Sequence, residues 1–236
     1  MTSRRVLSLL GAALAALLGT TLLTGCGGTS SPDKPAASPH QALAAAKARF
    51  DRATSVHLTL STKSTPKGGN GVLSADGVLT HAPAFKGEVE VYLNGIQAKV
   101  PVVSVGGKLY AKLPLTTHYA VIDPTEYGAP DPATFMDPHT GVSTLLTELQ
   151  HVKAAGQERS GRDILTTYTG TLPGSRVKPI IPSADPSSSY ATRVGIDQQG
   201  RIATVQVTGR FFAGRGAVTY DLTLDGYGAH VTIAAP

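Results

Sequence analysis

Cysteine, tryptophan and charged residues are all scarce in this chain of 236 residues. Its single cysteine, Cys26, excludes an intrachain disulfide and a thiolate zinc cluster, because structural zinc sites need several Cys or His ligands. Charged residues make up 16% of the chain and Lys and Arg form no long run, so nucleic-acid binding has little electrostatic support. The low charge, together with 26 Gly and 16 Pro, also excludes a coiled coil.

The common catalytic motifs are absent as well. The chain contains no GxSxG, GxGxxG, GxxxxGK[ST] or HExxH, the signatures of esterases, of dinucleotide and phosphate sites, and of metalloproteases. Glu88 and Glu90 lie on one face of an expected strand, where a solvated sheet face explains them better than a glycosidase carboxylate pair. The seven histidines share no ligand-like spacing. The sequence therefore predicts no enzyme, no cofactor and no metal site.

The first residues have the pattern of a secretory signal. Arg4 and Arg5 form a basic start, and residues 6–18 form an apolar stretch that is short for a bilayer span. Residues 23–26, Leu-Thr-Gly-Cys, resemble a bacterial lipobox, in which a signal peptidase cuts before a lipid-modified cysteine. We therefore predict a lipoprotein signal peptide at residues 1–25 and lipid attachment at Cys26. Removal of the signal lowers the formal net charge from +5 to +3.

The segment after the cysteine differs in composition from the remainder. Residues 27–39 have no apolar period and are rich in Gly, Ser and Pro, a composition typical of a disordered linker. We expect a tether at residues 26–39, starting from the lipidated Cys26. No further linker interrupts the chain, so residues 40–236 are expected to form a single domain.

The first part of this domain predicts one helix and then a meander of strands. Residues 41–53 place apolar side chains at helical spacing. Residues 56–61 alternate between apolar and polar side chains, as expected for a half-buried strand. Residues 84–93 and 96–105 alternate around Asn94-Gly95, a strong hairpin signal. Residues 108–113 and 119–122 predict two further strands.

The middle of the chain predicts helices again. Asp-Pro pairs at residues 131–132 and 137–138 each place a capping acid before a proline suited to the first helical turn, so two helical pieces should follow. Within residues 142–149 the apolar side chains recur at helical spacing. This stripe is expected to cover a core or to close a cavity.

The C-terminal half returns to strand patterns. The expected strands are residues 152–158, 162–171, 190–198, 201–211, 215–225 and 229–234, with a short helix at residues 176–181. Residues 225–228, Asp-Gly-Tyr-Gly, are interpreted as a turn between the last two strands. About eleven strands result, and a long antiparallel sheet curls, so its apolar face must be buried against helices or a ligand.

Several segments taken together resemble the LppX/LprAFG family of actinobacterial lipid-carrying lipoproteins, most closely its LprG-like members. The resemblance covers nearly the whole chain. It rests on the lipobox and tether, on residues 56–59 (VHLT), 105–111 (VGGKLYA), 137–146 (DPHTGVSTLL) and 220–228 (YDLTLDGYG). The family commonly has Trp where Tyr227 and Gly195 stand in this chain.

The resemblance implies an α+β fold, a curved antiparallel half-barrel of the LolA/LolB type with helices packed on its concave side around a large apolar cavity. It further implies a membrane-anchored lipoprotein on the outer face of the cytoplasmic membrane. Such a protein binds acylated lipid or glycolipid in its cavity and carries it within the cell envelope, for some members with a membrane exporter as partner. Members of the family are not known for catalysis.

Alternation along the strands and the stripe at residues 142–149 select the candidate cavity residues. They are Val89, Val91, Leu93, Ala98, Val100, Val102, Leu109, Ala111, Leu145, Leu146, Leu149, Val218, Tyr220 and Leu222. The main alternative is a structural or adhesive envelope lipoprotein in which these side chains form a filled core. A second alternative is a hydrolase of envelope lipids, in which Ser, His and acidic side chains would converge at the mouth of a cavity. A cavity well above the roughly 300–1,000 Å³ of ordinary ligand sites would favour the carrier.

Overall fold

The fold is known for most of the chain beyond the predicted tether. A computed structural model describes residues 37–65, 70–93, 95–127, 129–212, 214 and 216–236. The predicted signal peptide, Cys26 and the greater part of the tether lie outside the described residues, so these assignments stay predictions.

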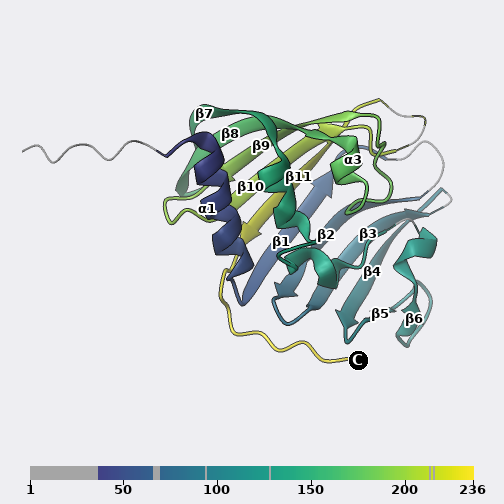
Figure 1. The fold of residues 1–236 in the computed structure, drawn as a ribbon. Coiled ribbons are helices and arrows are strands. Elements are labelled where there is room, and N and C mark those ends of the chain that lie inside the picture. The colour runs from purple at the N-terminus through teal and green to yellow at the C-terminus, as the bar shows by residue number, and fades with distance from the viewer. Residues whose placement is uncertain (1–36, 66–69, 94, 128, 213, 215) are drawn as a thin grey trace, which may run out of the picture. The chain divides into compact units, whose positions relative to one another are not determined.

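The described residues form one antiparallel sheet of eleven strands in the order β6-β5-β4-β3-β2-β1-β11-β10-β9-β8-β7 (Figure 1). The strands are β1 (Ser55–Thr62), β2 (Gly71–Thr80), β3 (Ala84–Leu93), β4 (Ile96–Val105), β5 (Lys108–Ala111), β6 (Ala120–Ile122), β7 (Gln150–Ser160), β8 (Asp163–Pro173), β9 (Ser189–Ile196), β10 (Ile202–Gly209) and β11 (Val218–Asp225). Most neighbours in the sheet are also neighbours in the chain. The pairing of β1 with β11 joins the first and last strands and lies at the centre of the sheet.

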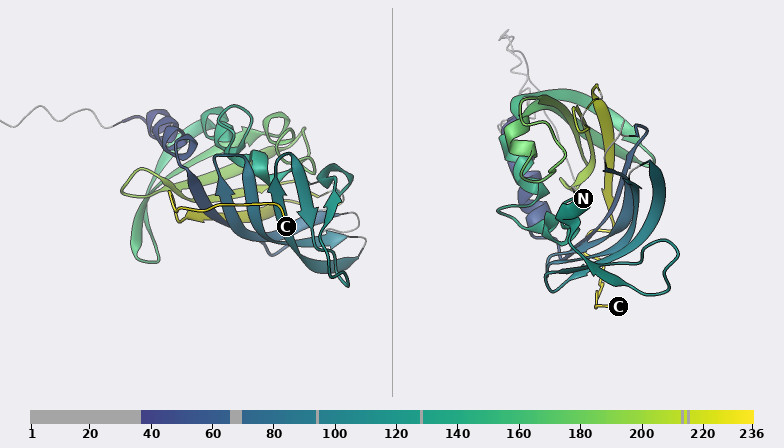
Figure 2. Two further views of the ribbon diagram at one scale, coloured as in Figure 1. Left: turned by 90° about the horizontal axis from the view of Figure 1, so that it is seen from below. Right: turned by 90° about the vertical axis from the view of Figure 1, so that its right-hand side faces the viewer.

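The helical segments lie on the concave side of this sheet. Figure 2 shows the sheet as an arc that curves around them. They are α1 (Pro39–Asp51), the 3₁₀ helices η1 (Pro124–Tyr127), η2 (Pro132–Met136) and η3 (Val142–Thr144), and the short helices α2 (Leu145–Glu148) and α3 (Gly174–Val177). This arrangement confirms the predicted α+β half-barrel.

Helix α1 closes one end of the concave side. A capping box at Ser38 satisfies its first backbone amides, with Gln41 as the reciprocal partner. Its apolar stripe, Leu43, Ala46 and Phe50, is at most 1% exposed and belongs to the main core cluster. Packing of this stripe, more than the helix propensity of its residues, therefore fixes α1 in place.

The N-terminal meander follows the predicted boundaries closely. Leu93 pairs with Ile96, as required for a two-residue hairpin connection, although Asn94 itself lies outside the described residues. The register places Phe85, Val89 and Val91 on the concave face.

Two strand assignments differ from the prediction. Strand β2 was not predicted, because a register shift between Val72 and Ser74 and the glycine at Gly77 interrupt its alternation. The predicted strand at residues 229–234 is wrong, since β1 already has a partner on each side. The chain there crosses the start of β1, where the Gly228 amide donates to the Ser55 carbonyl oxygen and the Ser55 hydroxyl donates to the Ala229 carbonyl oxygen.

The predicted helical pieces of the middle segment are only partly correct. The Asp131 carboxylate accepts the Ala133 amide at 3.0 Å and caps η2, as predicted. The Asp137 carboxylate instead accepts the amides of His139 and Thr140 in a turn, and the helical backbone starts at Val142. The predicted helix at residues 176–181 is the single turn α3, two residues earlier.

Candidate functional site

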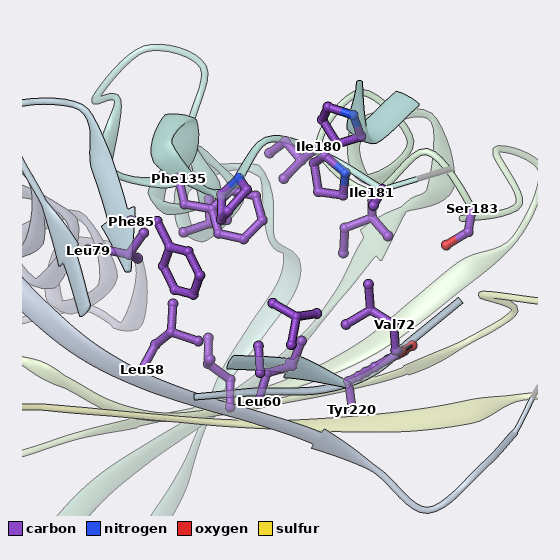
Figure 3. Close-up of a pocket in the computed structure, with 18 of the residues that line it drawn as sticks. Leu58, Leu60, Val72, Leu79, Phe85, Phe135, Ile180, Ile181, Ser183 and Tyr220 are labelled. Carbon is purple, nitrogen blue, oxygen red and sulfur yellow. Dashed lines mark hydrogen bonds between the residues drawn. The ribbon is translucent and has the colours of Figure 1, made fainter. Parts of the chain in front are cut away.

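An apolar cavity lies between the concave face of the sheet and the segments that cover it (Figure 3). Its volume is about 310 Å³. Among the described residues that line it, none is charged, and apart from two tyrosines the polar side chains are those of Ser143, Ser183 and Thr192. The volume lies at the lower end of the roughly 300–1,000 Å³ range of small-molecule sites. It therefore does not meet the size test that would favour a carrier, and the large cavity that the resemblance implies is not found among the described residues.

The side chains that line the cavity are more enclosed near α1 than further along the strands. Near α1, Leu58, Leu79 and Phe85 are at most 5% exposed. Further along the same strands Leu60 and Ala75, although inward-facing and central in the sheet, are only half-buried. These side chains face empty space in place of neighbouring side chains, which explains their residual exposure.

Buried polar contacts hold the segment from η2 to α2, which we call the cover, over the concave face of the sheet. The Ser104 hydroxyl on β4 donates to the Asp131 carboxylate at 2.6 Å, and Ser104 is fully buried. The Ser143 hydroxyl donates to the Asp51 carboxylate of α1, also at 2.6 Å. Lys47 on α1 joins this contact, since its ammonium lies 2.6 Å from Asp51 and 2.8 Å from the Pro138 carbonyl oxygen. Charge-assisted bonds of this kind are stronger than neutral ones, so the cover is fixed at both of its ends.

The stretch that carries the family resemblance shapes this cover. Hydrogen bonds from the backbone amides of His139 and Thr140 lower the pKa of Asp137. At Gly141 a Cβ would overlap the carbonyl oxygens of Phe135 and Asp137. The glycine thus lets the turn fold back tightly and brings the following apolar side chains over the cavity.

Tyr220 lies at the end of the cavity away from α1, which we call the open end. Its hydroxyl donates to the Val72 carbonyl oxygen, and its ring packs edge-on against that of Phe211 with 4.9 Å between the centroids. Burial raises the pKa of Tyr220, so the phenol stays neutral and acts as a donor. Figure 3 shows Val72, Ile181 and Ser183 near this end, across the cavity from Leu79.

The structure brings together most of the residues that alternation selected. Twelve of them line the cavity: Val89, Val91, Leu93, Val100, Val102, Leu109, Ala111, Leu145, Leu146, Leu149, Tyr220 and Leu222. Ala98 and Val218 are not among its lining residues. Val218 is 2% exposed in the core at the start of β11, and the methyl group of Ala98 packs against the core beside Val91. Whether the twelve contact a ligand stays a prediction.

Alternation missed the lining residues on other strands and in the loops. Leu58 and Leu60 on β1 belong to an alternating run, so the same signal could have identified them. Val205 and Val207 on β10 follow the same rule. Ile180 and Ile181 follow α3 in an irregular segment, and no periodic pattern points to them.

The convex face carries the charged groups. Glu88 pairs with Lys99 at 3.2 Å, and Glu90 accepts hydrogen bonds from Ser74 and Gln97, as expected for a solvated sheet face. The part of the chain that the structure describes has no group of three His, Cys, Asp or Glu placed to hold a metal ion. Within the same residues, no helix is long and apolar enough to cross a bilayer.

Residues 38–233 match the LppX_LprAFG lipoprotein family. The chain belongs to this family. Among solved structures it is similar to LprF from Mycobacterium bovis, with a TM-score of 0.68, 18% identity, and coverage of 84% of this chain and 96% of that one. It is also similar to LppX from Mycobacterium tuberculosis, with a TM-score of 0.62, 23% identity, and coverage of 83% and 98%.

These likenesses establish the shared fold, and the membership establishes a lipoprotein with the fold of a lipid carrier. The narrower resemblance to LprG-like members stays a prediction. No curated protein matches this sequence.

Proposed function

We propose that this lipoprotein binds an acylated lipid or glycolipid in its apolar cavity and carries it within the cell envelope. The proposal rests on the lining of the cavity, which is uncharged and almost entirely apolar, and on the half-buried inward side chains of the central strands. An empty apolar surface of this kind is costly in water, and acyl chains are the ligands that match it without needing polar partners.

The cavity volume favours one acyl chain at a time in this conformation. A volume near the lower limit for a small-molecule site suits a single flexible chain, and further chains would require the cover to move away from the sheet. The chain would lie between the inward faces of β1–β4 and the cover. The polar head would remain at the open end, near Ser183 and the Tyr220 hydroxyl.

Extraction tests this proposal directly. A protein of residues 37–236, purified from the cells that produce it, should release bound lipid into organic solvent. Mass spectrometry would detect this lipid. Val91→Trp places a large ring in the cavity and should lower the recovered lipid several-fold. The matched control, Tyr92→Trp, changes the next residue on the opposite face of β3 and should leave recovery unchanged.

An empty extract from the unchanged protein, with no uptake of lipid from vesicles, would refute carriage. It would favour the alternative, a structural or adhesive envelope lipoprotein. Equal recovery from both tryptophan variants would place the bound lipid outside this cavity.

We also propose that Cys26 carries the lipid anchor and holds the protein on the outer face of the cytoplasmic membrane. One acyl chain gives marginal anchoring and two or three give stable anchoring, since each buried methylene contributes about 0.8 kcal/mol. A clickable fatty acid fed to cells should label the unchanged protein and not Cys26→Ala. Labelling of both would contradict the anchor. A membrane exporter as partner is part of the same proposal and would be detected by crosslinking in membranes.

A further inference from the structure

A second cleft lies at the C-terminal end of α1, between that helix, the turn that joins β9 to β10 and the turn after β11. Its volume is about 410 Å³, and none of the described residues lines both it and the apolar cavity. Arg49, Arg52 and Arg201 line it, together with Thr54 and Gln199. None of the described residues that line it is acidic. Positive charge therefore gathers there, and we call it the arginine cleft.

Arg49 extends from α1 across to the opposite wall of the cleft. A Cβ on Gly200, in the turn between β9 and β10, would lie only 2.9 Å from Cζ of Arg49. Gly200 has a φ of 74°, which favours glycine, and the missing side chain leaves the space that the guanidinium occupies. Arg52 lies three residues further along the chain and is exposed. Within the described part of the chain, neither of these two arginines has an ion-pair partner.

Arg201 is held in position on the other wall. Its Nε donates to the Asp197 carboxylate at 2.7 Å, and its Cζ lies 5.3 Å from the centre of the Tyr227 ring. The Tyr227 hydroxyl in turn donates to the Ile202 carbonyl oxygen at 2.7 Å, which fixes the ring. A guanidinium has five N–H donors and this side chain is 41% exposed, so donors remain for a ligand. Because the side chain is already ordered, it loses little conformational entropy when a ligand binds.

The other carboxylates near the arginine cleft are paired elsewhere. Asp51, at the end of α1, pairs with Lys47 at 2.6 Å. Asp225, at the end of β11, lies 2.9 Å from Nδ1 of His57 on the convex face. The neighbouring turn between β7 and β8 carries an arginine and an aspartate at residues 162–163, whose charges cancel. Two of the three cleft guanidinium groups therefore lack a countercharge among the described residues, and an anion in the cleft would relieve their mutual repulsion.

The helix dipole explains only part of this arrangement. Cations near the C-terminus of a helix are favourable, and Nη1 of Arg49 also donates to the Ala45 carbonyl oxygen at 3.4 Å. This accounts for the arginines of α1. Arg201, however, belongs to a different part of the chain and directly precedes β10. The dipole does not explain why arginines from two separate segments line one cleft.

We propose that the arginine cleft binds a phosphate group. Guanidinium groups donate paired, parallel hydrogen bonds to phosphate oxygens, and a tetrahedral phosphate accepts such bonds from several directions at once. The chemistry is the same for a phosphate in a lipid headgroup and for one in a soluble compound, so the test has to separate these two sources. The site lies apart from the apolar cavity and does not depend on the proposed function.

Titration with inorganic phosphate tests the site. Residues 37–236 are suitable, because they form one compact unit whose core runs from Leu43 to Leu224. In about 150 mM NaCl, where weak attraction between surface charges is screened, phosphate should shift the backbone amide NMR signals of Gly200 and Gly228 in a saturable way.

Arginine variants show whether the cleft is the site. Arg49→Gln and Arg52→Gln should each weaken phosphate binding roughly tenfold, the loss expected for one charge-assisted contact. Arg49→Lys keeps the charge but loses the paired donors, and should weaken binding several-fold. The matched control is Arg176→Gln on α3, outside the cleft, which removes the same charge from a pair with Glu148 and should leave binding unchanged. Without phosphate, all these variants should unfold near the temperature of the unchanged protein, because each arginine is exposed.

Vesicles of phosphatidylcholine and phosphatidic acid in equal parts separate the two sources of phosphate. Cosedimentation that is lost in the double variant Arg49→Gln, Arg52→Gln would support a lipid phosphate as the ligand. Saturable shifts with inorganic phosphate, without such cosedimentation, would support a soluble phosphate compound. Absence of both results, or an equal loss of binding in Arg176→Gln, would overturn the phosphate site.

Discussion

Replacement of Ala75 by leucine distinguishes an empty cavity from a filled core. Ala75 lies on β2 at the centre of the sheet, between Leu60 on β1 and Val89 on β3, and all three line the cavity. It faces inward yet is only half-buried. A leucine here would extend into the cavity without a change in the backbone.

The sign of the stability change follows from the state of the interior. In the lipid-free protein, three added carbon atoms would leave water at about 0.8 kcal/mol each. Loss of side-chain freedom costs about 0.5–1 kcal/mol, which leaves a net gain of about 1.5 kcal/mol. In a filled core the same substitution would cost about 1–3 kcal/mol through overpacking.

Urea unfolding of delipidated protein measures this difference. The expected increase corresponds to a rise in Tm of roughly 3–6 °C for a domain of this size. Ala46→Leu is the matched control, since Ala46 is fully buried on the inner face of α1 and lies outside the cavity lining. This substitution should destabilise the protein by about 1–3 kcal/mol. If Ala75→Leu destabilises the protein as much as Ala46→Leu does, the interior is not hollow and the reasoning fails. Lipid recovery should also fall in Ala75→Leu, because the new side chain occupies part of the site.

Two further predictions concern the cover and the convex face. Gly141→Ala should destabilise the protein by about 2–4 kcal/mol in urea unfolding, because its Cβ would overlap two backbone carbonyl oxygens, whereas Gly216→Ala, in open space, should cost little. On the convex face, partial burial alone would lower the pKa of His57, but hydrogen bonds to Asp225 and Asp76 and the charges of both carboxylates raise it above 6.5. The stabilisation from protonated His57 is therefore complete below the unfolded value near 6.5 and is lost as the pH rises through the folded value. His57→Gln should lower the unfolding free energy by about 0.5 kcal/mol at pH 5.5 and by less at pH 8.5, and an equal loss at both would contradict the pKa direction.

Local alternation predicted those parts of the fold in which one face is buried and the register is regular. The hairpin of β3 and β4 has its predicted boundaries, because both strands alternate where they flank the turn, over residues 89–93 and 96–102. The same rule failed for β2, where a bulge and a glycine paired with Gly87 break the pattern. It also failed at residues 229–234, which alternate well enough but meet a sheet with no free edge beside β1.

The residues that line the cavity were harder to predict from the sequence than the strands around it. Alternation shows which side chains share a face, but it does not show whether that face meets other side chains or empty space. Val218 and Leu222 belong to one apolar face of β11, and only Leu222 lines the cavity. Val218 is buried at the start of β11, the end of this strand away from α1, so tertiary contacts and not distance along the strand decide which side chains line the cavity. For the same reason Ile180 and Ile181, in an irregular segment, could not be predicted.

Stability and lipid exchange are expected to depend on different parts of the concave side. Near α1 the lining side chains are closely enclosed and add to the stability of the fold. Hydrogen bonds such as that from Ser143 to Asp51 keep the cover in place without any ligand. On the proposed function, an acyl chain of about sixteen carbons would gain roughly 12 kcal/mol on leaving water, but a bilayer offers it nearly the same gain. Exchange between the cavity and a membrane is therefore close to balanced. A structure of this kind can lower the barrier to exchange, but the direction of transport has to come from a sink or from a partner that binds the loaded form.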